Sequence, residues 1–510
     1  MRKTEIINTK LGKIQGYIYE GISIFKGIPF AEPPVGELRL HDPMPKKPWD
    51  GILEAVKFGP EAPQPYNINT PQPRPIQSEE ECLTLNIWTP DTDSKKRPVM
   101  VWIHGGAFIY GSNSRAIYYG SNLARRGNVV VVTINYRLGP FSNLLMSGAS
   151  SNVGMLDQIT ALEWVHDNIE CFGGDPNNIT IFGESAGGFS VCTLMAMPKA
   201  KGLFKRAISQ SGGAHPLGYR KINLEQSTKL LLNELNLKPD QLDDFRQVPW
   251  LDIIKATFRI TQKADRQGTR VRFSPFIDGD TIPLHPIKAI DEGYAKDIEL
   301  IIGYNFEESK FNHMLLRNFK ETEPEELPRR MKRLLKFTGE SEDKFEDVIN
   351  IYKSSREENN LPSSPQDILD AYNTDNTFRI PSVRFAEGQS KHQKNTYMYI
   401  FSWQLPNMFG AMHGLEIGFV FNRFFNGEVP TLPKKSKVTV KLSENMMDSW
   451  ISFAENGDPN HKGIPKWPQY EIKERNTLIF DKTIKIWKDP LSKEREMWNK
   501  MNLLSRFPLK

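Results

Sequence analysis

The stretch Ile179-Thr-Ile-Phe-Gly-Glu-Ser-Ala-Gly-Gly188 decides how this chain folds. Its first four residues are typical of a short strand buried on both faces, and Ala186–Met197 has the composition of a helix that ends at Pro198. Between strand and helix lies Gly183-Glu184-Ser185-Ala186-Gly187, a Gly-x-Ser-x-Gly pattern. Small residues on both sides of Ser185 let the backbone turn sharply, so that the serine hydroxyl projects from the end of the strand. We therefore predict a strand, a tight turn and a helix, with Ser185 as a candidate nucleophile.

The segments around this turn repeat the alternation of strand and helix. Val99-Met-Val-Trp-Ile103 and Val129–Ile134 are short, apolar and rich in β-branched residues, and strand signals return at Glu299–Gly303 and Tyr397–Trp403. Between residues 156 and 169, apolar side chains recur at steps of three or four, which indicates a helix with one apolar face. This order predicts an α/β protein with a large, mostly parallel sheet and helices on both of its faces.

The length of 510 residues allows more than one domain organisation. At roughly one domain per 150 residues it suggests about three domains, but a large single α/β domain fits as well. Two charge-rich stretches, Leu224–Ala264 and Glu321–Asn360, have helical patterns and stand apart from the strand-and-helix alternation. We interpret them as helical segments added to the main fold.

Charge and composition exclude several classes of protein. The 66 Lys and Arg residues exceed the 61 Asp and Glu residues by only 5, which is too small a surplus to indicate nucleic-acid binding. Hydrophobic residues make up 39% of the chain, yet no apolar run reaches the length of a membrane span, and the first residues lack the apolar core of a signal peptide. Three cysteines cannot hold so long a chain together as a disulfide scaffold. We expect a cytoplasmic protein without nucleic-acid or membrane partners.

A second glycine-containing turn provides candidate donors for an oxyanion. His104-Gly105-Gly106-Ala107 follows the predicted strand Val99–Ile103 directly, and its small residues let backbone N–H groups approach a bound molecule closely. Together with the residue after the candidate nucleophile, this turn predicts an oxyanion hole made by the N–H groups of Gly106, Ala107 and Ala186.

Taken together, these motifs resemble the type B carboxylesterase family, which includes the cholinesterases. The matching stretches are dense over residues 10–215 and thinner beyond: Phe25-Lys-Gly-Ile-Pro-Phe-Ala-Glu-Pro-Pro-Val-Gly36, Glu81-Cys-Leu-Thr-Leu-Asn-Ile-Trp88, Trp102-Ile-His-Gly-Gly-Ala-Phe108, Asn135-Tyr-Arg137, Asp157-Gln158, Phe172-Gly-Gly-Asp-Pro176 and Phe182-Gly-Glu-Ser-Ala-Gly187. The resemblance implies an α/β-hydrolase fold and hydrolysis of small carboxylic esters without metal or cofactor. It also implies one catalytic domain over residues 1–510, with helical insertions around 220–265 and 320–375. It gives no oligomeric state.

The same resemblance implies a triad in the order nucleophile, acid, base. The base must follow both the nucleophile and the acid, which removes His41, His104 and His166, and we expect it to remove His215 as well. Five candidates are then left: His285, His313, His392, His413 and His461. His413 resembles the family's base position, because His-Gly is followed by an acidic residue and Phe-Val-Phe. The family's acid segment usually ends Asp-Glu-Gly, whereas this chain reads Glu307-Glu308-Ser309. Counting from Gly303 assigns the acid to Glu308, with Glu307 as its neighbour.

Two further positions follow from the resemblance. Ser209-Gln210-Ser211-Gly212 is similar to a Gln-Ser-Gly turn whose serine bonds near the triad acid, so Ser211 is a candidate supporting residue, with an ordinary turn serine as the alternative. Secretory members pair the cysteine at the Cys82 position with one about twenty residues earlier. This chain has Ala62 there. The resemblance thus implies a free Cys82 thiol, which agrees with a reducing compartment.

These predictions converge on a serine carboxylesterase that works through an acyl-enzyme intermediate. Ser185 attacks the ester carbonyl, His413 removes its proton and Glu308 orients the imidazole. A related acyl hydrolase, namely an amidase, thioesterase or lactonase, is the alternative within enzymes, because the same groups can cleave other acyl bonds. A non-catalytic binding homologue is a further alternative from a different class.

Overall fold

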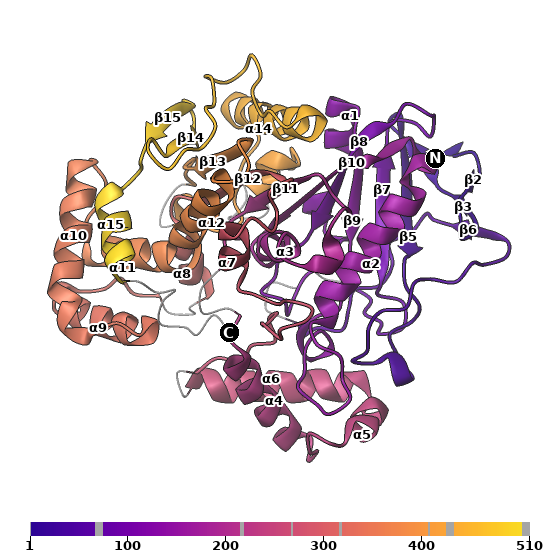
Figure 1. Ribbon diagram of the computed structural model, residues 1–510, viewed down its shortest axis with the longest axis horizontal. Helices are drawn as coiled ribbons and strands as arrows, with labels where there is room; N and C mark the ends of the chain where they lie inside the picture. The colour runs from indigo at the N-terminus through magenta and orange to yellow at the C-terminus, as the bar shows by residue number, and fades with distance from the viewer. Residues whose placement is uncertain are drawn as a thin grey trace.

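A large sheet forms the centre of the molecule (Figure 1). The structure is a computed structural model that describes residues 2–66, 75–214, 219–266, 269–315, 319–405, 409–424 and 433–501. In spatial order the strands of this sheet are β1 (Arg2–Lys3), β4 (Tyr17–Tyr19), β5 (Ile22–Pro29), β7 (Thr84–Thr89), β9 (Val130–Ile134), β8 (Arg97–Ile103), β10 (Gly174–Glu184), β11 (Arg206–Gln210), β12 (Glu299–Asn305), β13 (Thr396–Phe401), β14 (Asn476–Phe480) and β15 (Lys485–Lys488). A small second sheet joins β2 (Ile7–Asn8), β3 (Lys13–Gln15) and β6 (Ile52–Glu54).

The centre of the main sheet is parallel. Every neighbouring pair from β9 through to β14 is parallel, whereas the strands on the β1 side and the last strand, β15, are antiparallel to their neighbours. Each of the five residues of β9 is buried, as expected for a strand covered on both faces. The mostly parallel sheet predicted from the sequence is confirmed.

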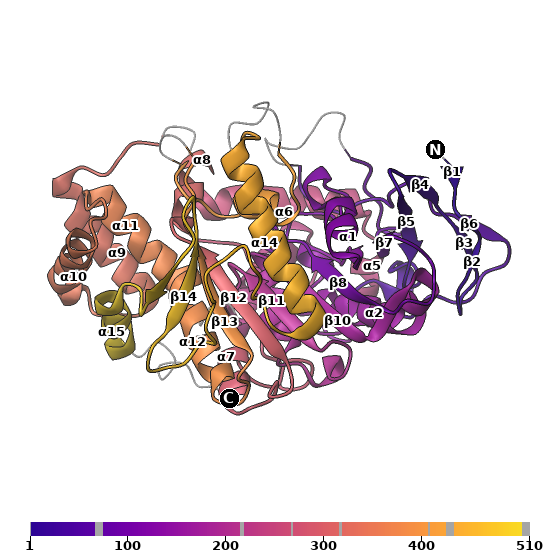
Figure 2. The ribbon, with the colours of Figure 1, turned by 90° about the horizontal axis from the view of Figure 1, so that it is seen from above.

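Helices cover both faces of this sheet (Figure 2). The helices α2, α3 and α12 pack on one face and α1 and α14 on the other. The helices are α1 (Ser121–Gly127), α2 (Val153–Asn168), α3 (Ala186–Leu194), α4 (Lys221–Glu234), α5 (Leu242–Gln247), α6 (Trp250–Arg266), α7 (Pro286–Asp291), α8 (Phe311–Leu315), α9 (Leu327–Thr338), α10 (Phe345–Glu358), α11 (Pro365–Thr374), α12 (Ile380–Ser390), α13 (Ile417–Val420), α14 (Lys437–Asn456) and α15 (Ser492–Met501). In the described ranges, none of them is long and apolar enough to cross a membrane.

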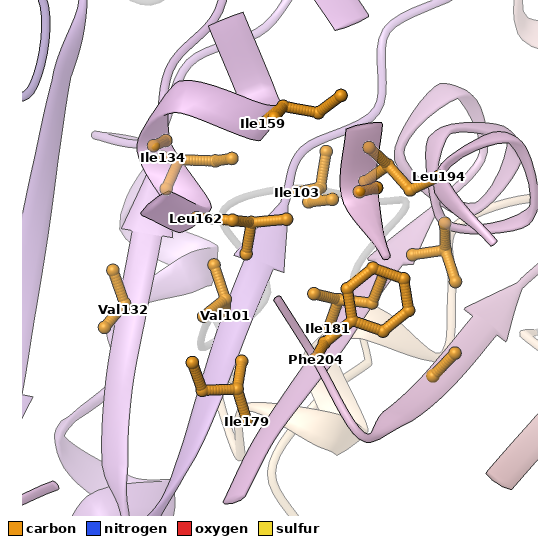
Figure 3. Close-up of a cluster of buried hydrophobic side chains, with 14 of the residues drawn as sticks. Val101, Ile103, Val132, Ile134, Ile159, Leu162, Ile179, Ile181, Leu194 and Phe204 are labelled. Carbon is orange, nitrogen blue, oxygen red and sulfur yellow. The ribbon is translucent and has the colours of Figure 1, made fainter. Parts of the chain in front are cut away.

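The alternation of side chains along the strands produces two apolar cores. Val101 and Ile181 point to the face covered by α2, where they belong to one apolar cluster with Leu162 of that helix (Figure 3). Their neighbours in the chain, Trp102 and Phe182, point to the opposite face and belong to the core under α14. This period of two is what a central strand requires when helices cover both of its faces.

Two groups of helices lie away from the sheet (Figure 1). The first, α4 to α6, has its own apolar cluster. The stretch predicted as helical over residues 224–264 is divided into three helices, because Pro239 and Pro249 lie at its breaks and proline interrupts helical hydrogen bonding. The second group, α9 to α11, shares an apolar cluster with α15, and the Trp498 indole of α15 donates to the Tyr352 hydroxyl of α10 over 2.7 Å.

Replacing Leu162 with alanine is expected to lower the free energy of unfolding by about 2–5 kcal/mol, because the lost side chain leaves a cavity in a closely packed core. The matched control is Leu230→Ala on α4, where the leucine is 43% exposed and the change is expected to stay within about 0.5 kcal/mol. Urea unfolding followed by circular dichroism measures both. Equal losses in the two variants would contradict this assignment of the core.

Candidate active site

The turn between β10 and α3 holds Ser185 in an unusual backbone conformation. Its φ of 56° and ψ of −123° lie in a region that side chains other than glycine rarely adopt. A Cβ added to Gly183 would lie 2.6 Å from the Gly187 carbonyl carbon, and one added to Gly187 would lie 1.9 Å from the Ile103 oxygen. The two glycines of the motif are therefore required by close backbone contacts. The predicted strand, turn and helix are confirmed.

The Ser185 side chain is partly exposed at this turn. Its backbone N–H donates to the Gln210 carbonyl over 2.9 Å, which fixes the turn against β11. Its hydroxyl forms no hydrogen bond to any other described residue, so the structure does not join Ser185 to His413 directly. Catalytic hydrogen bonds are often long in unliganded enzymes and shorten when substrate binds.

The predicted acid and base are brought into contact. Glu308 begins a short 3₁₀ helix, η6 (Glu308–Lys310), three residues after the end of β12. Its Oε2 lies 2.6 Å from His413 Nδ1, and its Oε1 accepts a 2.7 Å hydrogen bond from the Asn305 N–H. The Glu308 carboxylate is fully buried. It is thus held between its own strand and the imidazole, in the arrangement that lets a carboxylate select one tautomer of a histidine.

The other nitrogen of His413 faces the nucleophile turn. Its Nε2 lies 3.2 Å from Oε1 of Glu184, the residue directly before Ser185. A third carboxylate, that of Glu416, is buried close by and accepts hydrogen bonds from Gln210 and Asn305 over 3.1 and 2.6 Å. Sequence analysis did not assign a role to Glu184 or Glu416. The available signal was a charged side chain inside the apolar β10 segment and an acidic residue three places after His413.

This arrangement raises the pKa values of Glu184, Glu416 and His413. Burial raises the pKa of Glu184, and the neighbouring carboxylates of Glu416 and Glu308 raise it further. Burial also raises the pKa of Glu416. For His413, burial favours the neutral ring, but the charges of Glu184 and Glu308 outweigh that effect and raise its pKa. The cluster as a whole favours a proton on the imidazole.

The predicted oxyanion turn lies directly against Ser185. A Cβ added to Gly105 would lie 2.7 Å from the Glu184 carbonyl oxygen and 3.1 Å from the Ser185 Cβ. Ala107 has a φ of 56°, so the turn is tight at the positions predicted to donate. In the described ranges, the N–H groups of Gly106, Ala107 and Ala186 donate to no other residue. They are thus free of competing partners there and can serve a bound molecule.

A buried histidine supports this turn. The His104 ring stacks on Tyr136 with 4.5 Å between ring centroids, and its Nδ1 lies 2.8 Å from the Gly105 carbonyl oxygen. Burial lowers the pKa of His104 to about 4, so the ring is neutral near pH 7. We infer that a neutral Nδ1–H donates to this carbonyl and fixes the peptide that precedes Gly106.

Two other residues singled out in the sequence lie beside the acid segment. The Ser211 N–H donates to the Gly303 carbonyl of β12 over 2.8 Å, but its buried hydroxyl bonds to no residue in the described part of the chain. Glu307 accepts a 2.9 Å hydrogen bond from the Ala411 N–H and so connects the acid segment with the segment that carries His413. Among the described residues, no cluster of three His, Cys, Asp or Glu side chains could hold a metal ion.

Comparisons with known proteins identify the family of this chain. The model of the carboxylesterase family matches residues 3–498. The para-nitrobenzyl esterase of Bacillus subtilis is 38% identical over 96% of this chain and 98% of its own length. The medium-chain fatty acyl-CoA hydrolase precursor of Anas platyrhynchos is 33% identical over 96% of this chain and 91% of its own length.

A solved structure extends the likeness to the fold. The structure of a thermophilic PNB esterase has a TM-score of 0.84 and 37% sequence identity, and the match covers 96% of this chain and 99% of that chain. Its α/β-hydrolase fold agrees with the sheet and the flanking helices described above. The chain therefore belongs to the type B carboxylesterase family and is a carboxylic ester hydrolase.

Proposed function

We propose that this protein is a serine esterase that forms an acyl-enzyme intermediate on Ser185, with His413 as the base and Glu308 as the acid. The observation that carries the proposal is the 2.6 Å contact between Glu308 Oε2 and His413 Nδ1. That contact leaves Nε2 of the ring on the side of the nucleophile turn, where it can accept the Ser185 proton.

The reaction proceeds in two halves. In the first half, the Ser185 oxygen attacks the ester carbonyl while His413 Nε2 takes the hydroxyl proton. The carbonyl oxygen becomes an oxyanion, which the N–H groups of Gly106, Ala107 and Ala186 stabilise. When the intermediate collapses, the alcohol leaves with the proton from His413. In the second half, His413 deprotonates a water molecule that attacks the acyl-enzyme, and the carboxylic acid is released as Ser185 regains its proton.

The carboxylates around His413 act on the charged form of the ring. Glu308 accepts the Nδ1–H, fixes the tautomer and stabilises the imidazolium that forms in each half-reaction. Glu184 adds a second negative group 3.2 Å from Nε2. This pair stabilises the imidazolium but also makes the resting ring harder to deprotonate, so the protein needs a higher pH to present a neutral base.

A thioesterase is the second candidate. One relative is named as a fatty acyl-CoA hydrolase precursor, and a thioester uses the same nucleophile and oxyanion donors as an ester. The contacts described for Ser185, His413 and Glu308 do not distinguish these leaving groups. Amidase and lactonase activities remain alternatives on the same machinery.

The cytoplasmic location stays a prediction that rests on the cysteines. Cys82 is buried and unpaired, and Ala62, at the position of the secretory partner cysteine, is buried as well. Burial raises the pKa of the Cys82 thiol and keeps it protonated near pH 7.

Replacing Ser185 with alanine is expected to lower kcat for a p-nitrophenyl ester by at least about 10³-fold, because the nucleophile is lost. A fluorophosphonate probe should label the wild-type protein at Ser185 and leave the variant unlabelled, as read by peptide mass spectrometry. Ser390→Ala on α12 is the control, since that hydroxyl bonds only to the Glu387 carbonyl among the described residues. Wild-type turnover in Ser185→Ala would refute the mechanism.

The pH profile tests the carboxylate cluster. A neutral imidazole is the active base, and the surrounding carboxylates raise its pKa, so kcat/KM should reach half of its maximum above pH ~6.5, the ordinary pKa of histidine. Glu184→Gln removes one carboxylate and should move this midpoint to lower pH by roughly one unit. The exposed Glu225→Gln serves as the control. An identical midpoint in wild type and Glu184→Gln would argue against this role.

An ester, an amide and a thioester with the same butyryl group distinguish the proposed esterase from an amidase and from a thioesterase. The proposed esterase should show a kcat/KM for p-nitrophenyl butyrate at least about a hundredfold above that for p-nitrobutyranilide, because an amine leaves only when it is protonated. A butyryl thioester provides the third arm. Faster hydrolysis of the thioester than of the oxygen ester would favour the thioesterase.

A further inference from the structure

The segment that carries Glu308 is attached to the helical group α9 to α11. Ser309 stands where the family pattern ends in glycine, and its hydroxyl points to α11. It donates to the Asp370 carbonyl oxygen over 3.0 Å and lies 3.2 Å from Asp370 Oδ1. The Ser309 N–H donates to the Thr374 hydroxyl over 3.2 Å. One residue next to the proposed acid therefore makes three polar contacts to a helix outside the central sheet.

The contacts of Ser309 form a joint between η6 and α11, and Asp370 lies at its centre. Its side chain is almost completely buried, so its charge needs donors around it. His313 of α8 supplies Nε2 at 3.0 Å from Oδ2, and Gln366 donates to Oδ1 over 3.1 Å. Since α8 follows directly after η6, two consecutive elements, η6 through Ser309 and α8 through His313, contact the same carboxylate.

The same helical group reaches the imidazole through a second contact. Directly after α11 the chain forms a π-helix, η9 (Asp375–Arg379). Phe378 of this π-helix packs on the His413 ring with 4.7 Å between centroids. A π-helix inserts an extra residue into a turn and is frequent at functional sites. The group thus contacts both members of the Glu308–His413 pair.

Glu308 is consequently held from two sides. On the strand side, the Asn305 N–H fixes one oxygen of its carboxylate. On the helix side, the anchors of Ser309 fix the backbone of η6, from which the Glu308 side chain extends. A charge-assisted hydrogen bond of 2.6 Å is sensitive to small displacements, because its strength depends on distance and alignment.

We propose that Ser309 and Asp370 are positioning residues that set the geometry of the Glu308–His413 pair through the contact between η6 and α11. This inference rests on the proposed function, because it assigns the acid and the base to that pair. The replacement of glycine by serine gives this chain a side-chain bond to α11 that glycine could not make.

The test is Ser309→Ala, which removes the hydroxyl and keeps the backbone. We expect kcat for p-nitrophenyl butyrate to fall about tenfold, with KM within about twofold, since the lost bond misplaces the acid without touching the substrate. The pH midpoint of kcat/KM should also fall, because a displaced Glu308 raises the pKa of His413 less. The groups that face His413 are Glu184, Glu308 and Glu416, and only Glu308 is attached to this joint.

The matched control is Ser355→Ala on α10. Its hydroxyl also donates to a buried carboxylate, that of Glu494 over 2.5 Å. Ser355 lies in the same helical group, and among the described residues its hydroxyl forms no hydrogen bond to the acid segment. This variant should lose thermal stability as Ser309→Ala does, yet keep kcat within about twofold and the wild-type pH midpoint. Asp370→Asn retains both acceptors for Ser309, and its kcat should stay within about threefold of wild type.

Three outcomes would overturn the inference: a wild-type kcat and pH midpoint in Ser309→Ala, an equal loss of kcat in Ser309→Ala and Ser355→Ala, or a tenfold loss in Asp370→Asn with none in Ser309→Ala. If Ser309→Ala does not fold, Ser309→Gly, which also removes the hydroxyl and restores the residue of the family pattern, replaces it under the same criteria. Failure of the proposed function is separate, because it would show in the wild-type protein as missing fluorophosphonate labelling at Ser185. Labelled, active wild type with an unaffected Ser309→Ala refutes only the positioning role.

Discussion

The close approach of three backbone segments at the end of β10 is the constraint on which the structure depends. The first turn of α3 lies so near the end of β8 that no side chain fits between them at Gly187. The same crowding holds the oxyanion turn against Ser185 through Gly105. These contacts leave one conformation for the turn. The strained positive φ of Ser185 persists because the sheet and the two turns impose it together. The position of the nucleophile therefore depends on the packing of the whole sheet.

Local patterns predicted the elements that depend on local physics. Apolar, β-branched runs located β8 and β9, and two prolines explain why one predicted helical stretch is three helices. Ser185 was predicted from its own motif, whereas the acid and the base came from resemblance, since nothing in the spacing of Glu308 and His413 alone brings them together. The role of Glu184 was not predicted, because its contact with His413 forms only when segments more than two hundred residues apart meet in a buried space. Glu416 lies three residues after His413, but its sequence position does not show that the carboxylate is buried beside the ring.

Several carboxylates around one imidazole have opposing effects on the reaction. Each buried negative group stabilises the imidazolium of the transition state, but it also stabilises that ion in the resting enzyme. The balance depends on which carboxylates are ionised, and burial disfavours ionisation of Glu184 and Glu416. Glu308 accepts from the Asn305 N–H, and its second polar partner is the His413 ring itself, at Nδ1. Glu416 accepts instead from two neutral amides, those of Gln210 and Asn305.

The sharing of one apolar cluster by α9 to α11 and α15 has a consequence during synthesis of the chain. The Trp498 side chain that completes this cluster emerges from the ribosome 146 residues after Tyr352, its partner on α10. The last two strands of the central sheet, β14 and β15, also lie directly before α15 in the sequence, so the sheet and this helical group can be completed only at the same late stage. The packing of α11, and with it hydrolytic competence, would therefore be acquired only when the end of the chain has been synthesised.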